Sequence, residues 1–210
     1  MLFLRGFLLW LRRLRYPGSQ RYWERRYARG GHSGAGSSGR LAGYKARWLN
    51  DFVRIHHIGS VLEFGCGDGQ QLLLAEYPAY RGLDVAPAAL ERCRRLFAND
   101  AGKQFDLYVP ATFDPRAVQA DLTLSLEVIF HLTEDDLYHA HLRHLFGSAR
   151  RWVVIFSADE AASSPFPHFR LRRFSADVPA GWQLRERVPN PHRDISVSDF
   201  FVFEKISASA

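Results

Sequence analysis

The chain has 210 residues, of which 47% are hydrophobic and 14% aromatic, enough for one well-buried domain with terminal additions. Its net charge of +6 favours anionic partners. Cys66 and Cys93 lack the spacing of a zinc site and are too few for a disulfide framework, and no apolar run reaches the ~20 residues that span a bilayer. We therefore expect a cytoplasmic protein without a bound metal.

The first element predicted is a helix over residues 3–14, with an apolar face and an arginine-rich face. Pro17 and Gly18 end it. Two interpretations stay open: peripheral contact with the inner face of a membrane, or packing on the chain's own domain or a partner subunit. We expect this helix in residues 1–18, cap helices and a Gly/Ser loop in 19–57, and the main domain in 58–206.

The cap region holds two predicted helices, a short aromatic one near residues 22–27 and a second over 41–56. Ser37 or Ser38 is the expected N-cap of the second. Between them lies RGGHSGAGSSGR, Arg29 to Arg40. Because this stretch joins two helices inside an ordered region, we interpret it as an ordered loop and not as a flexible linker.

From residue 60 onward, short apolar runs alternate with helical segments. Strands are predicted at 61–64, 80–85, 105–109, 121–126, 151–157, 182–188 and 200–205, and helices from 69, over 86–97 and over 133–146, the last opened by Thr133. The alternation predicts an α/β fold with a mostly parallel, doubly wound seven-stranded sheet, an antiparallel C-terminal edge hairpin and N-terminal cap helices.

The stretch EFGCGDG, residues 63–69, contains the end of the first predicted strand and leads toward a helix, so its glycines form a turn at the carboxyl end of a sheet. Gly65, Gly67 and Gly69 spell GxGxG, which differs from the GxGxxG of pyrophosphate-binding folds. Glu63 beside the turn suits a positively charged cofactor. Asp84 follows Gly65 by 19 positions, near the ~20-residue interval at which an acid meets ribose hydroxyls. A tight turn without a ligand is the alternative.

Over roughly Tyr22 to Lys205 the chain resembles the class I methyltransferases that use S-adenosylmethionine. The resemblance lies in ExGxGxG at 63–69, GLDVA at 82–86 and DLTLSLEVIFHL at 121–132. It implies that the turn holds the amino acid part of the cofactor, that the acid after the second strand binds the ribose, and that the fourth strand lines the methyl-donor side. The implied cofactor-binding residues are Glu63, Gly65, Cys66, Gly67, Gly69, Asp84, Val85, Ser125, Leu126 and Glu127. For the adenine, Thr112 or Asp114 is a candidate, with an ordinary loop position as the alternative.

Acceptor and catalytic residues are predicted in three other segments. His131 follows the fourth strand and is a candidate general base, since histidine titrates near neutral pH; a structural role is the alternative. The resemblance also implies that the segment before the first strand covers the cleft, so the Gly/Ser loop is expected to close as a lid, from which Tyr22 and His32 would touch the acceptor. His168, Arg170 and Arg172 lie in a long connection, where arginines favour carboxylate or phosphate; a solvated basic loop is the alternative.

These features predict a methyltransferase for a small-molecule acceptor, sugar-like or anionic. A nucleic-acid (RNA) methyltransferase stays open because the chain is basic, although LEVI at 126–129 replaces the DPPY-type motif of amino-methylating DNA enzymes. A non-catalytic S-adenosylmethionine-binding protein also stays open, because fold does not establish reaction. The GxGxG spacing disfavours an NAD-linked oxidoreductase.

Overall fold

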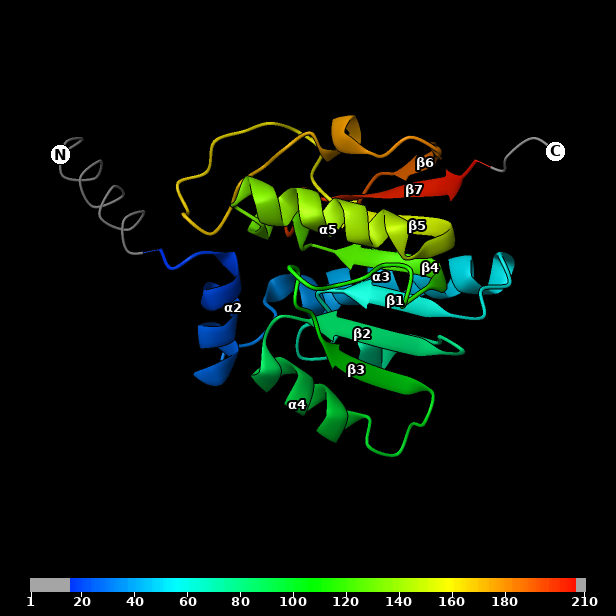
Figure 1. The fold of residues 1–210 in the computed structure, drawn as a ribbon, viewed down its shortest axis with the longest axis horizontal. Coiled ribbons are helices and arrows are strands. Elements are labelled where there is room, and N and C mark those ends of the chain that lie inside the picture. Colours follow the sequence, from blue (N-terminus) through cyan, green and yellow to red (C-terminus); the bar gives the residue numbers. More distant parts are fainter. Residues whose placement is uncertain (1–15, 207–210) are drawn as a thin grey trace.

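A computed structural model describes residues 16–206 of the chain (Figure 1). The helix predicted over residues 3–14 lies outside the described residues. The two cap helices are confirmed as α2 (Ser19–Ala28) and α3 (Gly39–Ile55). The loop between them contains a single 3-10 turn, η1 (Ala35–Ser37). None of the helices among residues 16–206 is long and apolar enough to cross a membrane.

The centre of the molecule is one seven-stranded sheet with the order β3-β2-β1-β4-β5-β7-β6. β1 to β5 run parallel, and β7 pairs antiparallel with both β5 and the edge strand β6. The predicted fold class, including the C-terminal edge hairpin, is confirmed. The strands are β1 (Val61–Phe64), β2 (Tyr80–Asp84), β3 (Lys103–Leu107), β4 (Ala120–Leu126), β5 (Ala149–Ser157), β6 (Trp182–Val188) and β7 (Asp199–Lys205).

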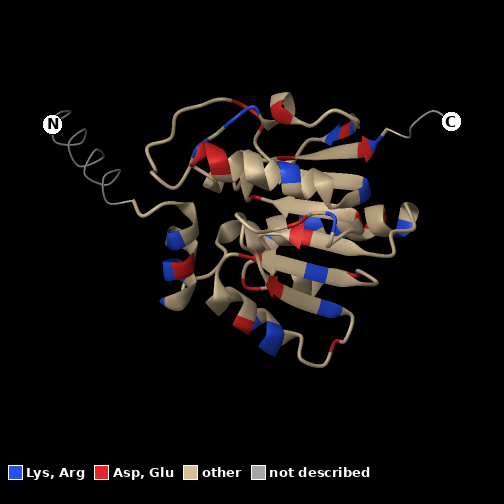
Figure 2. Cartoon of the chain, viewed as in Figure 1, with Lys and Arg blue, Asp and Glu red and all other residues tan. Residues whose placement is uncertain are grey.

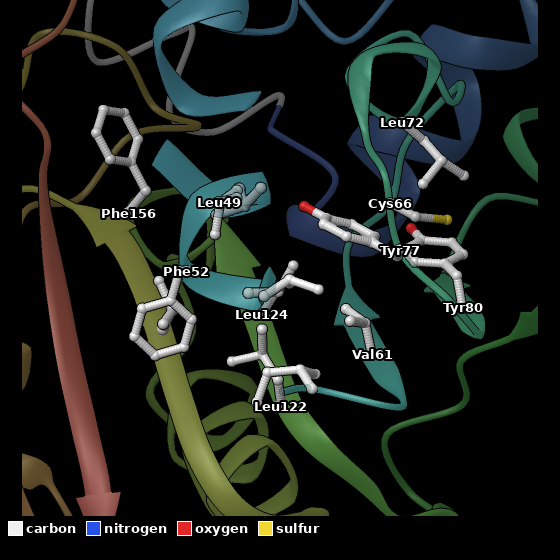
Figure 3. Close-up of a cluster of buried hydrophobic side chains, with 14 of the residues drawn as sticks. Leu49, Phe52, Val61, Cys66, Leu72, Tyr77, Tyr80, Leu122, Leu124 and Phe156 are labelled. Carbon is white, nitrogen blue, oxygen red and sulfur yellow. The ribbon is translucent and has the colours of Figure 1, made fainter. Parts of the chain in front are cut away.

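Helices cover both faces of this sheet, because alternate residues of each central strand point to opposite sides. On β1, Val61 joins the apolar cluster under α3 and α4 (Pro87–Leu96), whereas Leu62 and Phe64 join the cluster under α5 (Asp135–Gly147). Figure 3 shows the α3 side, where Leu49 and Phe52 from α3 meet β1, β4 and β5. The central strands are therefore buried on both faces, as their continuous apolar sequences predict.

Two local predictions were wrong. The helix expected from residue 69 is only a 3-10 turn, η2 (Leu72–Leu74), because Pro78 disfavours helix before it and the chain must reach β2 within a few residues. Thr133 does not open α5: Glu134 occupies the N-cap position, and the Thr133 hydroxyl lies within hydrogen-bond distance of Ser19 and Glu134. The N-cap predicted for α3 is confirmed at Ser38, although its hydroxyl donates to the Ala35 carbonyl and makes no cap bond.

The order of the strands creates a switch point between β1 and β4. The chain leaves β1 toward β2 on one side and leaves β4 toward β5 on the other, so the connections at their carboxyl ends diverge. In open parallel sheets, ligands bind in the crevice at such a point. The glycine turn follows β1 and Glu127 follows β4, which places both at this crevice.

Candidate active site

A cavity of about 610 Å³ opens at the switch point, within the size range of small-molecule sites. It brings together residues of the glycine turn, the ends of β2 and β4, the cap helices and the connection after β5. Eleven of the residues predicted from the sequence line it: Tyr22, Glu63, Gly65, Cys66, Gly67, Asp84, Val85, Leu126, Glu127, His131 and His168.

The glycine turn is tied to the end of β2 through Asp84. The backbone N–H of Gly67 donates to Asp84 Oδ2 at 2.9 Å, and that of Ala86 donates to Oδ1 at 2.9 Å. Gly67 has a φ of 59°, and a Cβ atom there would collide with the hydroxyl of Ser33. Glycine is therefore required both by the backbone conformation and by the close approach of the Gly/Ser loop.

Two buried carboxyl groups face the cavity. Burial raises the pKa of Glu63 to about 7 and the pKa of Asp84 to about 6. The Tyr80 hydroxyl donates to Glu63 Oε2 at 2.7 Å. A positively charged ligand in the cavity would favour the ionised form of both groups, so the site is suited to bind a cation.

Cys66 lies beside these acids. A hydrogen bond with Cys93 and burial raise the pKa of the Cys66 thiol well above its ordinary value. The thiol is therefore protonated at neutral pH and does not serve as a nucleophile. Its position in the cavity lining agrees with a small residue that fills space beside a ligand.

Glu127 occupies the other wall of the crevice in a left-handed conformation, with a φ of 59°. Such a backbone costs of order 1 kcal/mol for a residue that is not glycine. Its carboxylate lies 3.3 Å from Lys45 Nζ and accepts a hydrogen bond from Ser196 Oγ at 2.8 Å. Gly36 of the Gly/Ser loop packs directly on the same carboxylate. Four separate segments of the chain thus meet at Glu127.

The Gly/Ser loop is docked over the glycine turn. Ser33 Oγ donates to Asp68 Oδ1 at 2.6 Å, and the Asp68 N–H donates back to Ser33 Oγ at 3.2 Å. Tyr27 Oη lies 2.9 Å from Ser33 Oγ. The Arg92 guanidinium holds the start of the loop by donating to the carbonyls of Gly31 and Tyr27. The loop therefore covers one side of the cavity.

His131 lies where the connection after β4 meets the cap helices. Its Nδ1 is 3.0 Å from the carbonyl oxygen of His168. Because a carbonyl only accepts hydrogen bonds, Nδ1 carries the proton, which leaves a lone pair on Nε2. Burial lowers the pKa of His131 to about 4, so the ring is neutral at physiological pH. It has the protonation state that a general base needs.

The remaining predicted residues lie outside the cavity lining. His32 faces a separate surface depression beside Arg92, and Gly69 packs toward α4. Ser125 is buried within the sheet, where its hydroxyl pairs with His141 Nε2 at 2.9 Å. Arg170 and Arg172 point to the start of α5. They bond to the carbonyls of Leu132 and Thr133 and pair with Asp135.

For the adenine, neither Thr112 nor Asp114 lines the cavity, whereas Tyr108 does. Further lining residues carry polar groups that no sequence motif marks, among them Lys45, Gln71 and Ser196. Gln71 Nε2 donates to the Ala42 carbonyl at 3.1 Å, but its buried Oε1 has no hydrogen-bond partner among the described residues. An unpaired buried oxygen beside the glycine turn is a ready acceptor for a ligand N–H or O–H group.

No protein-family model matches the chain, and no curated protein sequence matches it. Several solved structures, in contrast, are similar to this chain in fold. The N-methyltransferase NodS from Bradyrhizobium japonicum WM9, in complex with S-adenosyl-L-homocysteine, superposes with a TM-score of 0.70 at 16% identity, over 90% of this chain and 98% of that one. This is the fold of the class I methyltransferases.

The structures of two other methyltransferases are also similar to this chain. Magnesium protoporphyrin IX methyltransferase (ChlM) from Synechocystis PCC 6803, with bound SAH, has a TM-score of 0.60 at 14% identity, over 78% of this chain and 83% of that one. The methyltransferase domain of bacterial CtHen1 has a TM-score of 0.64 at 18% identity, over 80% and 100%. The resemblance inferred from the glycine turn and Asp84 is thus confirmed in three dimensions, at the level of fold.

Proposed function

We propose that the protein is an S-adenosylmethionine-dependent methyltransferase that acts on a small-molecule acceptor. The observation that carries this proposal is the cavity at the switch point, which places the glycine turn, two buried acids and a neutral histidine around one space. The structural neighbours NodS and ChlM contain S-adenosylhomocysteine, the product form of this cofactor.

The residues present fit this cofactor. The unpaired Oε1 of Gln71 and the buried acids offer hydrogen-bond acceptors for an ammonium group and for ribose hydroxyls. In this assignment the glycine turn and Gln71 hold the amino acid part, Asp84 and Val85 the ribose, and Tyr108 borders the adenine. When bound, S-adenosylmethionine would supply an electrophilic methyl group on a sulfonium sulfur.

The chain's own residues would then align and deprotonate the acceptor. His131 Nε2 would take the proton from the acceptor hydroxyl or amine during transfer of the methyl group that S-adenosylmethionine would supply. The docked Gly/Ser loop keeps water out of the cavity, which prevents competing hydrolysis and strengthens electrostatic contacts inside it.

Isothermal titration calorimetry with S-adenosylmethionine, and with NADH as a comparison ligand, tests the cofactor assignment. We expect the methyl donor to bind and Asp84→Ala to weaken it by about tenfold or more, since a hydrogen bond to a charged group contributes about 1.5–3 kcal/mol. Asp114→Ala, at an exposed position outside the cavity, serves as the matched control. Thermal unfolding of each variant verifies that it is folded.

Three outcomes would contradict the proposal. NADH binding without S-adenosylmethionine binding would contradict the cofactor. Cofactor binding without turnover to S-adenosylhomocysteine, across a panel of acceptors, would favour the non-catalytic alternative. RNA binding with a steep salt dependence, together with RNA-dependent turnover, would favour the nucleic-acid alternative.

A further inference from the structure

One end of the cavity is walled by six aromatic rings, contributed by three separate segments. The rings contact one another: Tyr22 stacks on His168 with centroids 4.7 Å apart, and Trp23 lies edge-on to His131 at 4.9 Å. We call these residues the aromatic wall: Tyr22 and Trp23 from α2, Phe130 and His131 after β4, and His168 and Phe169 after β5. Contacts between rings hold the wall in one arrangement without a ligand.

Two polar groups at this end are already bonded within the protein. Ser19 donates from both its hydroxyl and its backbone N–H to the Glu134 carboxylate, and His131 Nδ1 donates to the His168 carbonyl. An acceptor with many hydroxyls, such as a sugar, would leave water without replacing its hydrogen bonds, which is costly. A flat ring would bury its faces against the wall.

Positive charge stands beside the wall in Arg26, which also lines the cavity. Its guanidinium lies 5.5 Å from the centroid of the Trp23 ring, and its Nε donates to the His32 carbonyl at 2.8 Å. Within residues 16–206 no carboxylate pairs with Arg26, unlike Arg170 and Arg172. Besides burial, its charge helps to lower the pKa of both His131 and His168, so its field reaches across the wall.

We propose that the methyl acceptor is a planar aromatic compound with an anionic group on its ring, a carboxylate or its equivalent, bound by the aromatic wall and by Arg26. This inference rests on the proposed function and names its substrate class. A ring hydroxyl or N–H is methylated: its proton goes to His131 Nε2, its heteroatom bonds to the methyl carbon, and the carbon–sulfur electron pair stays on sulfur. A planar guanidinium suits a carboxylate because it can donate two parallel hydrogen bonds.

Calorimetric titrations in the presence of saturating S-adenosylhomocysteine test this assignment. The probes are 4-hydroxybenzoate and 6-hydroxy-2-naphthoate, which combine a ring with a carboxylate. Two comparison compounds each lack one feature: 4-hydroxybenzamide is aromatic but neutral, and trans-4-hydroxycyclohexanecarboxylate is anionic but not aromatic. We expect at least one aromatic carboxylate to bind at least tenfold more tightly than both comparison compounds.

Variants assign the preference to residues. Arg26→Gln should bring the affinity ratio between carboxylate and amide close to one, whereas Trp23→Leu should weaken all aromatic probes alike. Arg25→Gln, an exposed neighbour on the same helix, should change neither the carboxylate-to-amide affinity ratio nor the affinity for the aromatic probes.

The outcomes separate the two proposals. If S-adenosylhomocysteine itself does not bind, the proposed function fails, and the acceptor assignment fails with it. If it binds but neither aromatic carboxylate does, or the comparison compounds bind equally well, only the acceptor assignment is overturned. Retention of the carboxylate preference in Arg26→Gln would also overturn it.

Discussion

Ser33 donates a hydrogen bond from its hydroxyl to Asp68 Oδ1 at 2.6 Å, and this bond fastens the Gly/Ser loop to the glycine turn. Asp68 directly follows Gly67, whose N–H is bound by Asp84. The loop, the turn and the proposed ribose-binding acid are therefore linked by two hydrogen bonds and the peptide bond between Gly67 and Asp68. A ligand that contacts Asp84 would affect the position of the loop.

Ser33→Ala should loosen the loop. The variant leaves the Asp68 carboxylate without its hydroxyl partner, which costs about 1.5–3 kcal/mol for a charged hydrogen bond. We expect faster tryptic cleavage at Arg29 or Arg40 and less protection by S-adenosylmethionine, measured by limited proteolysis. Ser38→Ala is the control, because that hydroxyl contacts only the Ala35 carbonyl. Equal cleavage of the two variants would argue against the loop as a lid.

Gly36→Ala should push the loop away from Glu127. An added Cβ would overlap the Glu127 carboxylate, whereas Gly43→Ala in α3 would meet only the end of the Arg47 side chain, at 3.4 Å. Overpacking of this kind costs about 1–3 kcal/mol, so we expect cofactor affinity to fall about tenfold. Calorimetry on both variants provides the measurement. An unchanged dissociation constant for Gly36→Ala would show that loop docking and cofactor binding are independent.

His131→Gln should lower kcat by about 10²–10⁴ and leave cofactor affinity unchanged, because general base catalysis contributes that factor. Since the pKa of His131 is about 4 in the folded protein, the base is neutral above that pH. Activity that depends on it should persist from pH 8 to pH 6 and fall only as pH decreases toward 4. His139→Gln, exposed on α5, is the control. A kcat equal to that of the wild type would assign His131 a structural role.

Glu63→Gln should change how stability depends on pH. The folded-state pKa of about 7 exceeds the ordinary value of 4.5, so the folded protein retains a proton that the unfolded chain releases between these values. The contribution of the Glu63 carboxyl to the free energy of unfolding is therefore fully present below pH 4.5 and is lost as the pH rises through 7. Urea unfolding at pH 5 and pH 8 should show a decline that is smaller in the variant by on the order of 2 kcal/mol.

The control for this comparison is Glu160→Gln, at an exposed position. It should show the same decline as the wild type. If Glu63→Gln also does so, the Glu63 carboxyl is ionised in the folded protein at pH 5.

The cofactor side of the cavity could be predicted from the sequence because its signals are local. Gly65 and Gly67 lie within one turn, and Asp84 follows at a spacing fixed by one strand, one connection and the next strand. Parallel pairing of β1 with β2 then places these residues together without further information. The alternation of strands and helices likewise predicts the sheet and its edge hairpin.

Contacts between distant segments could not be predicted in this way. Glu127 meets Lys45 and Ser196, which are 82 and 69 positions away, and no spacing in the sequence relates them. Arg170 and Arg172 were assigned to the acceptor because of their charge. In the folded chain both guanidinium groups pair with the single Asp135 carboxylate at the start of α5, and the arginine that lines the cavity is Arg26. Charge alone does not tell which partner a guanidinium will find.

The two outer strands of the sheet have a consequence for how the molecules behave at high concentration. β3 presents the exposed Asp106, and β6 presents Arg185 and Arg187; Figure 2 shows charged residues on both strands. A second molecule that added a strand at either border would have to dehydrate these charges, which is costly. Both borders therefore resist the strand-by-strand growth that leads to aggregates, and the sheet stays at seven strands.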